Sequence, residues 1–249
     1  MRNNLVYDLP LRLFHWLFAG LFATAYVVAS TAEDSSLFPW HMLAGLTLVF
    51  VVLARVAWGL FGTRHARFTS FRLNPADLFR YLEGLFTGGK AAVAGHNPAS
   101  SWVAVVLMIL ALGLGATGYL MTSGGNPESY EEVHEFLANT FLLIVVLHIA
   151  GVVFHSLRHR DGFALSMVDG RKQGIDPADT IASPRSAIGV VFIAVVAAFA
   201  VNVVRNYDAG SQTLNLFGTT LQLGEQEGDE QGEAAGSSEH AGEEQDEDD

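Results

Sequence analysis

Three histidines on one long apolar segment are the residues whose type and spacing point to chemistry. His134, His148 and His155 lie in VHEFLANTFLLIVVLHIAGVVFHSLRHR, residues 133–160. Fourteen residues make almost four helical turns, so His134 and His148 are expected on nearly the same helix face, about 21 Å apart along its axis. Neutral imidazole is a common metal ligand. The spacing therefore indicates two metal centres, one near each end of a single helix.

Long apolar runs are the elements that must position these histidines. Each run is close to the roughly 20 residues that span a bilayer as a helix. Only helices and closed barrels satisfy every backbone polar group in lipid. The chain is therefore expected to be an all-α membrane protein with five transmembrane helices, at about 11–30, 42–60, 102–120, 136–154 and 187–204.

Two further histidines lie at depths that match the first pair. His41 immediately precedes the second run, level with His134 near the start of the fourth. His15 follows the start of the first run by four residues, and His148 precedes the end of the fourth by six. The depths therefore pair His41 with His134 and His15 with His148.

Two level pairs of histidines in a helix bundle are what two haems with bis-histidine ligation require. Each iron takes an imidazole nitrogen from either side, and the flat macrocycle lies between helices. The chain has no cysteine, which excludes thiolate ligation and a c-type haem but not haem b. A single intramembrane histidine is more often a hydrogen-bonded core residue. Four at matched depths favour iron ligation by His15, His41, His134 and His148.

Three other residues are expected to contact the cofactors. Arg55 lies 14 residues after His41, at the level of the other pair, where a charge needs a partner such as a haem propionate; the alternative is an arginine that reaches the headgroups. Gly45, one turn after His41, leaves room for a haem plane or serves helix packing. His155 approaches a propionate or a quinone head group, or is an interfacial polar residue.

Charge is distributed unevenly along the chain. All Lys and Arg residues except Arg205 lie up to the start of the first run, between the second and third runs, or between the fourth and fifth, with Arg55 counted at the end of its run. The positive-inside rule then predicts a multi-pass protein of the bacterial inner membrane, with a cytoplasmic N-terminus and a periplasmic C-terminus. Twelve of the 26 acidic residues follow Leu223, in a low-complexity segment expected to be disordered.

Three regions follow from this organisation. Residues 1–175 are expected to form a di-haem four-helix transmembrane domain, 176–207 a connector and the fifth helix, and 208–249 the periplasmic acidic tail.

Within the loop after the second run, an interfacial helix is expected from about Pro75 to Phe86. His65 is expected to be solvated and His96 to be a turn residue. The segment TLNLFGTTLQL, residues 213–223, alternates weakly like a strand.

Four stretches resemble one known family: VYDLPLRLFHWLF, PWHMLAGLTLVFVVLARVAWGLFGTRHARF, GHNPAS and the histidine-bearing stretch of residues 133–160. In order and spacing, from about Val6 to Lys172, the sequence is similar to the bacterial cytochrome b561 type, which includes the cytochrome b subunits of nickel-iron hydrogenases. The resemblance implies a four-helix bundle with two b haems, a quinone site near the cytoplasmic haem, and ligand roles for the paired histidines. The fifth helix and acidic tail depart from that pattern.

The leading hypothesis is electron transfer across the membrane between quinone and a periplasmic partner. A basic c-type cytochrome is the expected partner if the acidic tail attracts it; the tail otherwise only solubilises the protein. The chain would alternatively anchor a hydrogenase or another periplasmic oxidoreductase. A superoxide:quinone oxidoreductase is disfavoured because the outer loops are acidic. A metal transporter needs carboxylates within the spans, and the five runs contain none. No nucleic-acid partner is expected.

Overall fold

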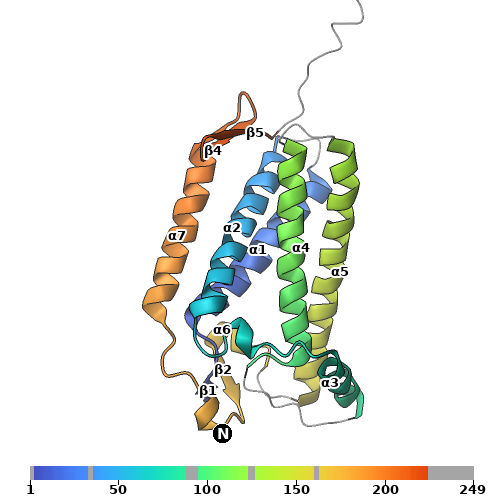
Figure 1. The fold of residues 1–249 in the computed structure, drawn as a ribbon, viewed down its shortest axis with the longest axis vertical. Coiled ribbons are helices and arrows are strands. Elements are labelled where there is room, and N and C mark those ends of the chain that lie inside the picture. The colour runs from blue at the N-terminus through green and yellow to red at the C-terminus, as the bar shows by residue number, and fades with distance from the viewer. Residues whose placement is uncertain (1–2, 33–35, 88–94, 123–126, 160–162, 224–249) are drawn as a thin grey trace, which may run out of the picture.

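The computed structural model describes residues 3–32, 36–87, 95–122, 127–159 and 163–223. Most of this chain is helical, with a few short strands outside the long helices (Figure 1). The helices are α1 (Leu9–Thr31), α2 (Pro39–Phe61), α3 (Pro75–Thr87), α4 (Pro98–Thr122), α5 (Pro127–His159), α6 (Ser166–Asp169) and α7 (Ser186–Arg205), with 3-10 turns at Phe68–Ser70 and Pro177–Asp179. The strands are β1 (Asn3–Leu5), β2 (Arg171–Gln173), β3 (Tyr207–Asp208), β4 (Thr213–Leu216) and β5 (Thr219–Gln222).

Five of these helices, α1, α2, α4, α5 and α7, are long and apolar enough to cross a membrane, which confirms the predicted fold class. Proline stands at the first position of α2, α4 and α5, where its missing N–H costs no helical hydrogen bond. Helix α5 starts nine residues before its apolar run and ends five after it. Polar residues therefore extend this helix beyond the hydrocarbon at both ends.

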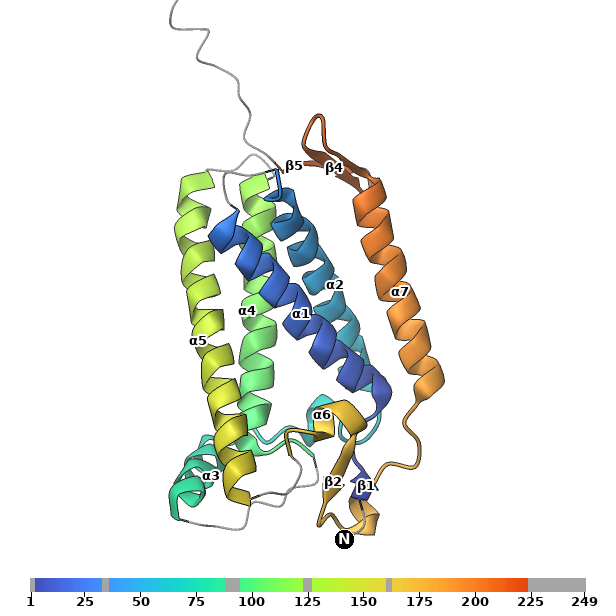
Figure 2. The same cartoon turned by 180° about the vertical axis from the view of Figure 1, so that it is seen from behind.

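Four of the spanning helices form a bundle (Figures 1 and 2). Helix α1 packs along α2, α4 packs along α5, and α2 joins the two pairs through α4. Between α1 and α5, the fully buried ring of Phe141 stacks on Phe22 with ring centres 4.0 Å apart and on Phe18 at 5.6 Å. Phe141 lies seven residues from both His134 and His148. An aromatic stack therefore joins the two helix pairs midway between the two histidine levels.

Helix α7 lies outside the bundle, against α1 and α2. The ring of Phe199 stacks on Phe50 with centres 4.1 Å apart and planes 5° from parallel. At the other end of α7, a Cβ on Gly189 would lie only 2.7 Å from Cδ2 of Leu9. The missing side chain of Gly189 therefore allows α7 to approach the start of α1.

The N-terminal segment is fixed to the end of the bundle that holds α3, β1 and β2, which we call the basic end. Strand β1 pairs antiparallel with β2. The fully buried carboxylate of Asp8 accepts hydrogen bonds from Leu11 N at 2.9 Å, Trp58 Nε1 at 3.1 Å and Thr63 Oγ1 at 2.6 Å. Asp8 therefore caps α1 and also fixes it to the end of α2. The predicted helix from Pro75 to Phe86 is present here as α3.

The opposite end of the bundle is covered by a three-stranded antiparallel sheet in the order β3-β4-β5, which follows α7 directly. Leu214, Leu221 and Leu223 form a buried cluster with Leu43 of α2 and Val203 of α7. The segment 213–223, which was expected to alternate like a strand, contains β4 and β5, so this sheet occupies the start of the region predicted as the tail, residues 208–249. The acidic segment after Leu223 lies outside the described residues.

Replacement of Asp8 by alanine tests its role in the fold. We expect Asp8→Ala to lower the thermal unfolding temperature in detergent. The change removes a helix cap worth about 0.5–2 kcal/mol and leaves buried donors unpaired at about 1–3 kcal/mol. Asp77→Ala is the control, because Asp77 forms an exposed ion pair with Arg80 worth roughly 0–1 kcal/mol. Equal unfolding temperatures for the two variants would contradict this role.

Candidate metal centres

The structure brings His41 and His134 together at the end opposite the basic end. Their ring centres lie 6.0 Å apart, with the ring planes inclined at 70°. One metal ion bonded to a nitrogen of each ring, at about 2.0–2.1 Å, could bridge such a separation. The ring of Phe38 stacks on His41 with centres 5.5 Å apart. Two histidines therefore lie together at the depth that the sequence predicted, and the ring of His41 packs against an aromatic side chain.

The hydrogen bonds of these rings define which nitrogen carries the proton. Nδ1 of His41 lies 2.8 Å from the carbonyl oxygen of Ala25, which can only accept, so Nδ1 donates. Nδ1 of His134 lies 2.8 Å from Thr117 Oγ1, whose own hydrogen points to the backbone carbonyls of Gly113 and Leu114. Each neutral ring then has a lone pair on Nε2, the arrangement typical of metal-bound histidine. Nε2 of neither ring makes a hydrogen bond to any described residue.

His15 and His148 form the second pair, toward the basic end. His15 lies within electrostatic range of His148, which agrees with their predicted common depth. Nδ1 of His15 is buried and has no hydrogen-bond partner in the described part of the chain. The ring of His15 packs edge-on against Trp16, with centres 5.2 Å apart. The second pair thus includes a buried imidazole nitrogen that still needs a partner.

Arg55 is 2% exposed, and its Nη1 has no hydrogen-bond partner within the described ranges. Three aromatic rings surround the guanidinium, with Cζ 5.7 Å from the centre of Phe14, 5.1 Å from Phe68 and 6.0 Å from Phe71. Cation–π contacts of this kind stabilise a guanidinium, but they provide no counter-charge. The alternative of an arginine that reaches the headgroups is wrong, because the side chain is enclosed.

The glycines near the pairs differ in what surrounds them. Apart from Gly45 itself, its two chain neighbours and the nearby backbone of its own helix, no atom lies within 4 Å of the position that a Cβ on Gly45 would take, so space is open one turn after His41. A Cβ on Gly115 would instead lie 2.3 Å from Val49 Cγ2, whereas one on Gly118 would lie 3.7 Å from His134 Cε1. Gly115 therefore serves helix packing, whereas the space at Gly45 is open.

His155 is buried at the contact between α3 and α5. Its Nδ1 lies 3.1 Å from the hydroxyl of Tyr81, which also accepts from Asn97 Nδ2 at 2.9 Å. Its ring centre lies 4.6 Å from that of Phe163. The structure therefore places His155 in a polar network at the basic end, on the same helix as His148.

Sequence reasoning did not identify a second group of buried polar residues at the basic end. His65 and His96, expected to be a solvated residue and a turn residue, are 5% and 7% exposed, and Lys172 is 5% exposed. Their burial depends on contacts between distant segments, such as the 2.7 Å hydrogen bond between His65 Nε2 and the carbonyl of Asp179. Thr117 was also missed, because a threonine within an apolar run has no distinguishing pattern.

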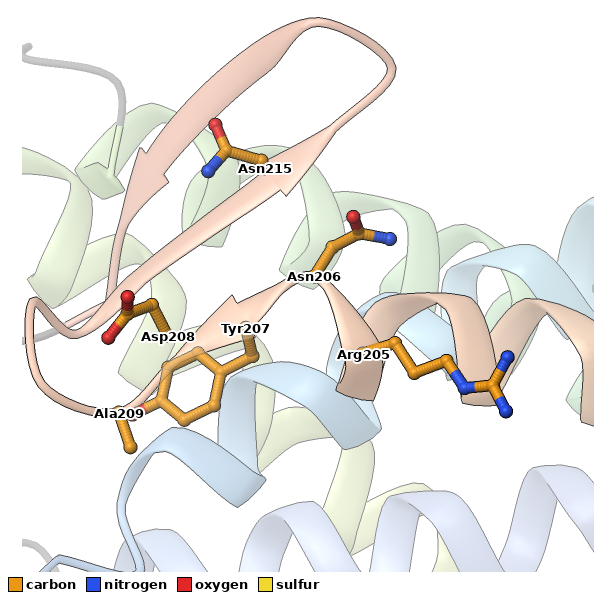
Figure 3. A pocket seen from close by; sticks show the side chains of 6 residues that line it. All are labelled: Arg205, Asn206, Tyr207, Asp208, Ala209 and Asn215. Atoms are coloured by element: carbon orange, nitrogen blue, oxygen red, sulfur yellow. The ribbon is translucent and has the colours of Figure 1, made fainter.

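A surface hollow of about 500 Å³ lies at the end of α7, beside strands β3 and β4; Figure 3 shows the residues that line it. Its lining is polar and contains none of the histidines. Backbone N–H groups of Ser211 and Gly210 hold the pKa of Asp208, at its edge, below the usual value. The hollow is separate from the histidine pairs and is lined by Arg205, Asn206, Tyr207, Asp208, Ala209 and Asn215.

Comparison with known proteins identifies the bundle. The family model described as "Prokaryotic cytochrome b561" matches residues 6–170, which include both histidine pairs. No curated protein and no solved structure matches the chain. Because the match covers more than half of the 249 residues, the chain belongs to the prokaryotic cytochrome b561 family and is a multi-pass membrane protein that binds b haem and transfers electrons.

Proposed function

We propose that the protein carries electrons across the bacterial inner membrane by means of two b haems. His41 and His134 are the ligands of one haem, and His15 and His148 are the ligands of the other. The observation that carries this proposal is the His41–His134 pair, whose ring centres lie 6.0 Å apart and whose Nδ1 atoms are held by protein oxygens. Such hydrogen bonds fix the ring orientation and raise the basicity of the ligating nitrogen.

The residues around the pairs fit this cofactor. Neutral imidazoles on opposing helices supply the donors that a bis-histidine haem needs. The open space at Gly45 offers room beside one pair, and the unpartnered Nη1 of Arg55 offers a donor to a propionate near the other. When bound, haem b supplies a one-electron redox couple, while the protein provides ligation, orientation and the local electrostatics. Residues 1–175 form the di-haem domain in this proposal.

The two ends of the bundle suit different partners. By the positive-inside rule we assign the basic end to the cytoplasm, and the polar network of His155, Tyr81 and Asn97 belongs to this end. We assign the quinone site to this end, with His155 as a residue that contacts quinone or propionate. The 12 acidic residues after Leu223 then belong to the periplasmic side, where they attract a basic c-type cytochrome.

Removal of one ligand from each pair tests the di-haem assignment. Wild-type protein is expected to carry two haems b per chain in a pyridine haemochrome assay. His41→Ala and His148→Ala are each expected to lose a different haem in the reduced-minus-oxidised spectrum, because each removes a ligand of a separate iron. His65→Asn is the control and is expected to retain both haems. Colourless wild-type protein, expressed with adequate haem, would contradict the proposal.

A substitution at Thr117 tests the hydrogen bond that orients the ring of His134. Thr117→Val removes the acceptor for Nδ1 of His134, and loss of such a contact typically weakens metal binding by about 10–100-fold. We expect faster transfer of one haem to apomyoglobin and no change in the other. Thr47→Val is the matched control, because Thr47 bonds only the Leu43 carbonyl among the described residues. Equal transfer rates for both variants would refute this role.

If the acidic tail attracts a basic cytochrome c, the rate of electron transfer between the two proteins should depend on ionic strength. Truncation after Leu223 is expected to slow reduction or oxidation of a basic soluble cytochrome c at low salt, because a long-range attraction is lost. The difference should vanish near 1 M salt, where the Debye length is about 3 Å. A full-length variant with the 12 acidic residues replaced by Asn and Gln is the control for tail length. Identical rates at every salt concentration would show that the tail only solubilises the protein.

A further inference from the structure

Two buried side-chain nitrogens near the basic end have no hydrogen-bond partner among the residues that the structure describes. They are Nη1 of Arg55, which is a donor, and Nδ1 of His96, which donates in one of the two neutral tautomers. The ring of Phe71 packs against both, with its centre 4.9 Å from that of His96 and 6.0 Å from Cζ of Arg55. The two nitrogens therefore border the same region of the protein interior.

Arg55 also carries a buried positive charge, and it forms no ion pair with any described residue. The one buried carboxylate among the described residues is that of Asp8. Both oxygens of Asp8 already accept hydrogen bonds from the groups that it caps and fixes. Burial raises the pKa of Tyr7, so its phenol stays neutral. Because an uncompensated buried charge is strongly unfavourable, the region needs an anionic acceptor.

Contacts with Lys172 and Tyr7 hold His96 and its neighbour Gly95 in place. Lys172 Nζ donates to the carbonyl of Gly95 at 2.8 Å and to the hydroxyl of Tyr7 at 3.1 Å. The ring of Tyr7 in turn packs against His96 with centres 5.4 Å apart. Burial, followed by the charges of Arg55 and Lys172, lowers the pKa of His96 to about 3. The ring is therefore neutral near pH 7 and has one N–H to donate.

We propose that His96 and Arg55 together bind a propionate carboxylate of the haem held by His15 and His148, and that Lys172 positions His96. This inference rests on the di-haem function proposed above. His15 lies within electrostatic range of His96, and the guanidinium of Arg55 lies 5.7 Å from the ring of Phe14, the neighbour of His15. A carboxylate supplies both the missing acceptor and the missing negative charge, and charge-assisted hydrogen bonds of this kind are strong.

Infrared difference spectroscopy tests this assignment on the holoprotein. Haem labelled with ¹³C at its propionate carboxyls identifies the carboxylate bands in the reduced-minus-oxidised spectrum. His96→Ala and Arg55→Gln are expected to shift a labelled band and to lower the midpoint potential of the basic-end haem, because a less neutralised carboxylate stabilises ferric iron. The potential of the other haem should not change. Lys172→Met is expected to act in the same direction with a smaller shift.

Matched variants make the result decisive. His96→Asn keeps a donor near the Nδ1 position and is expected to restore the wild-type band. His65→Asn removes an equally buried histidine whose Nε2 bonds the Asp179 carbonyl, and should shift neither the band nor the potential. If His96→Ala fails to retain its haem, His96→Asn decides: retention with the wild-type band supports the proposal, and loss overturns it.

Two outcomes would overturn the inference directly. One is an unchanged labelled band and potential in both His96→Ala and Arg55→Gln with both haems bound. The other is a changed response to added quinone with unchanged propionate bands, which would assign the two donors to a quinone carbonyl. Wild-type protein with fewer than two haems would instead contradict the proposed function, so the two failures can be told apart.

Discussion

A polar side chain within a hydrocarbon layer must find a partner, because no water is available to solvate it. The arrangement of this bundle follows from that requirement at two histidine levels, with the histidines on α1, α2 and α5. Where a partner is present in the chain, the side chain is oriented by it, as for His41 on the Ala25 carbonyl and His134 on the Thr117 hydroxyl. Where none is present among the described residues, as at Nη1 of Arg55, the unmet requirement indicates what kind of group would bind.

Helix number and histidine depth were predictable because both depend on short-range regularities of the sequence. Apolar runs of membrane-spanning length leave few alternatives to helices, and the constant helical rise converts spacing into depth. The partners of the histidine rings were not predictable, since Ala25 and Thr117 approach them from other helices. The same is true of His96 and Lys172, whose burial depends on segments 76 residues apart in the sequence. The strands after α7 were partly missed because short alternating segments resemble linkers.

Helix α7 and its sheet lie beyond the region that matches the family model. Their packing is nevertheless specific, with Gly189 close to Leu9 at one end and the leucine cluster around Leu43 at the other. Because Leu43 follows His41 by two residues, the sheet covers the bundle next to the histidine pair at that end. An addition to the family core thereby contributes to the surroundings of one candidate metal centre.

The aromatic stack of Phe18, Phe22 and Phe141 has a consequence for energy conservation. The hydrophobic side chains packed around this stack offer no groups that support a chain of ordered water. A proton needs such a chain to move, whereas an electron does not. Such an apolar layer opposes the passage of protons, so electron transfer past it would not discharge a proton gradient across the membrane.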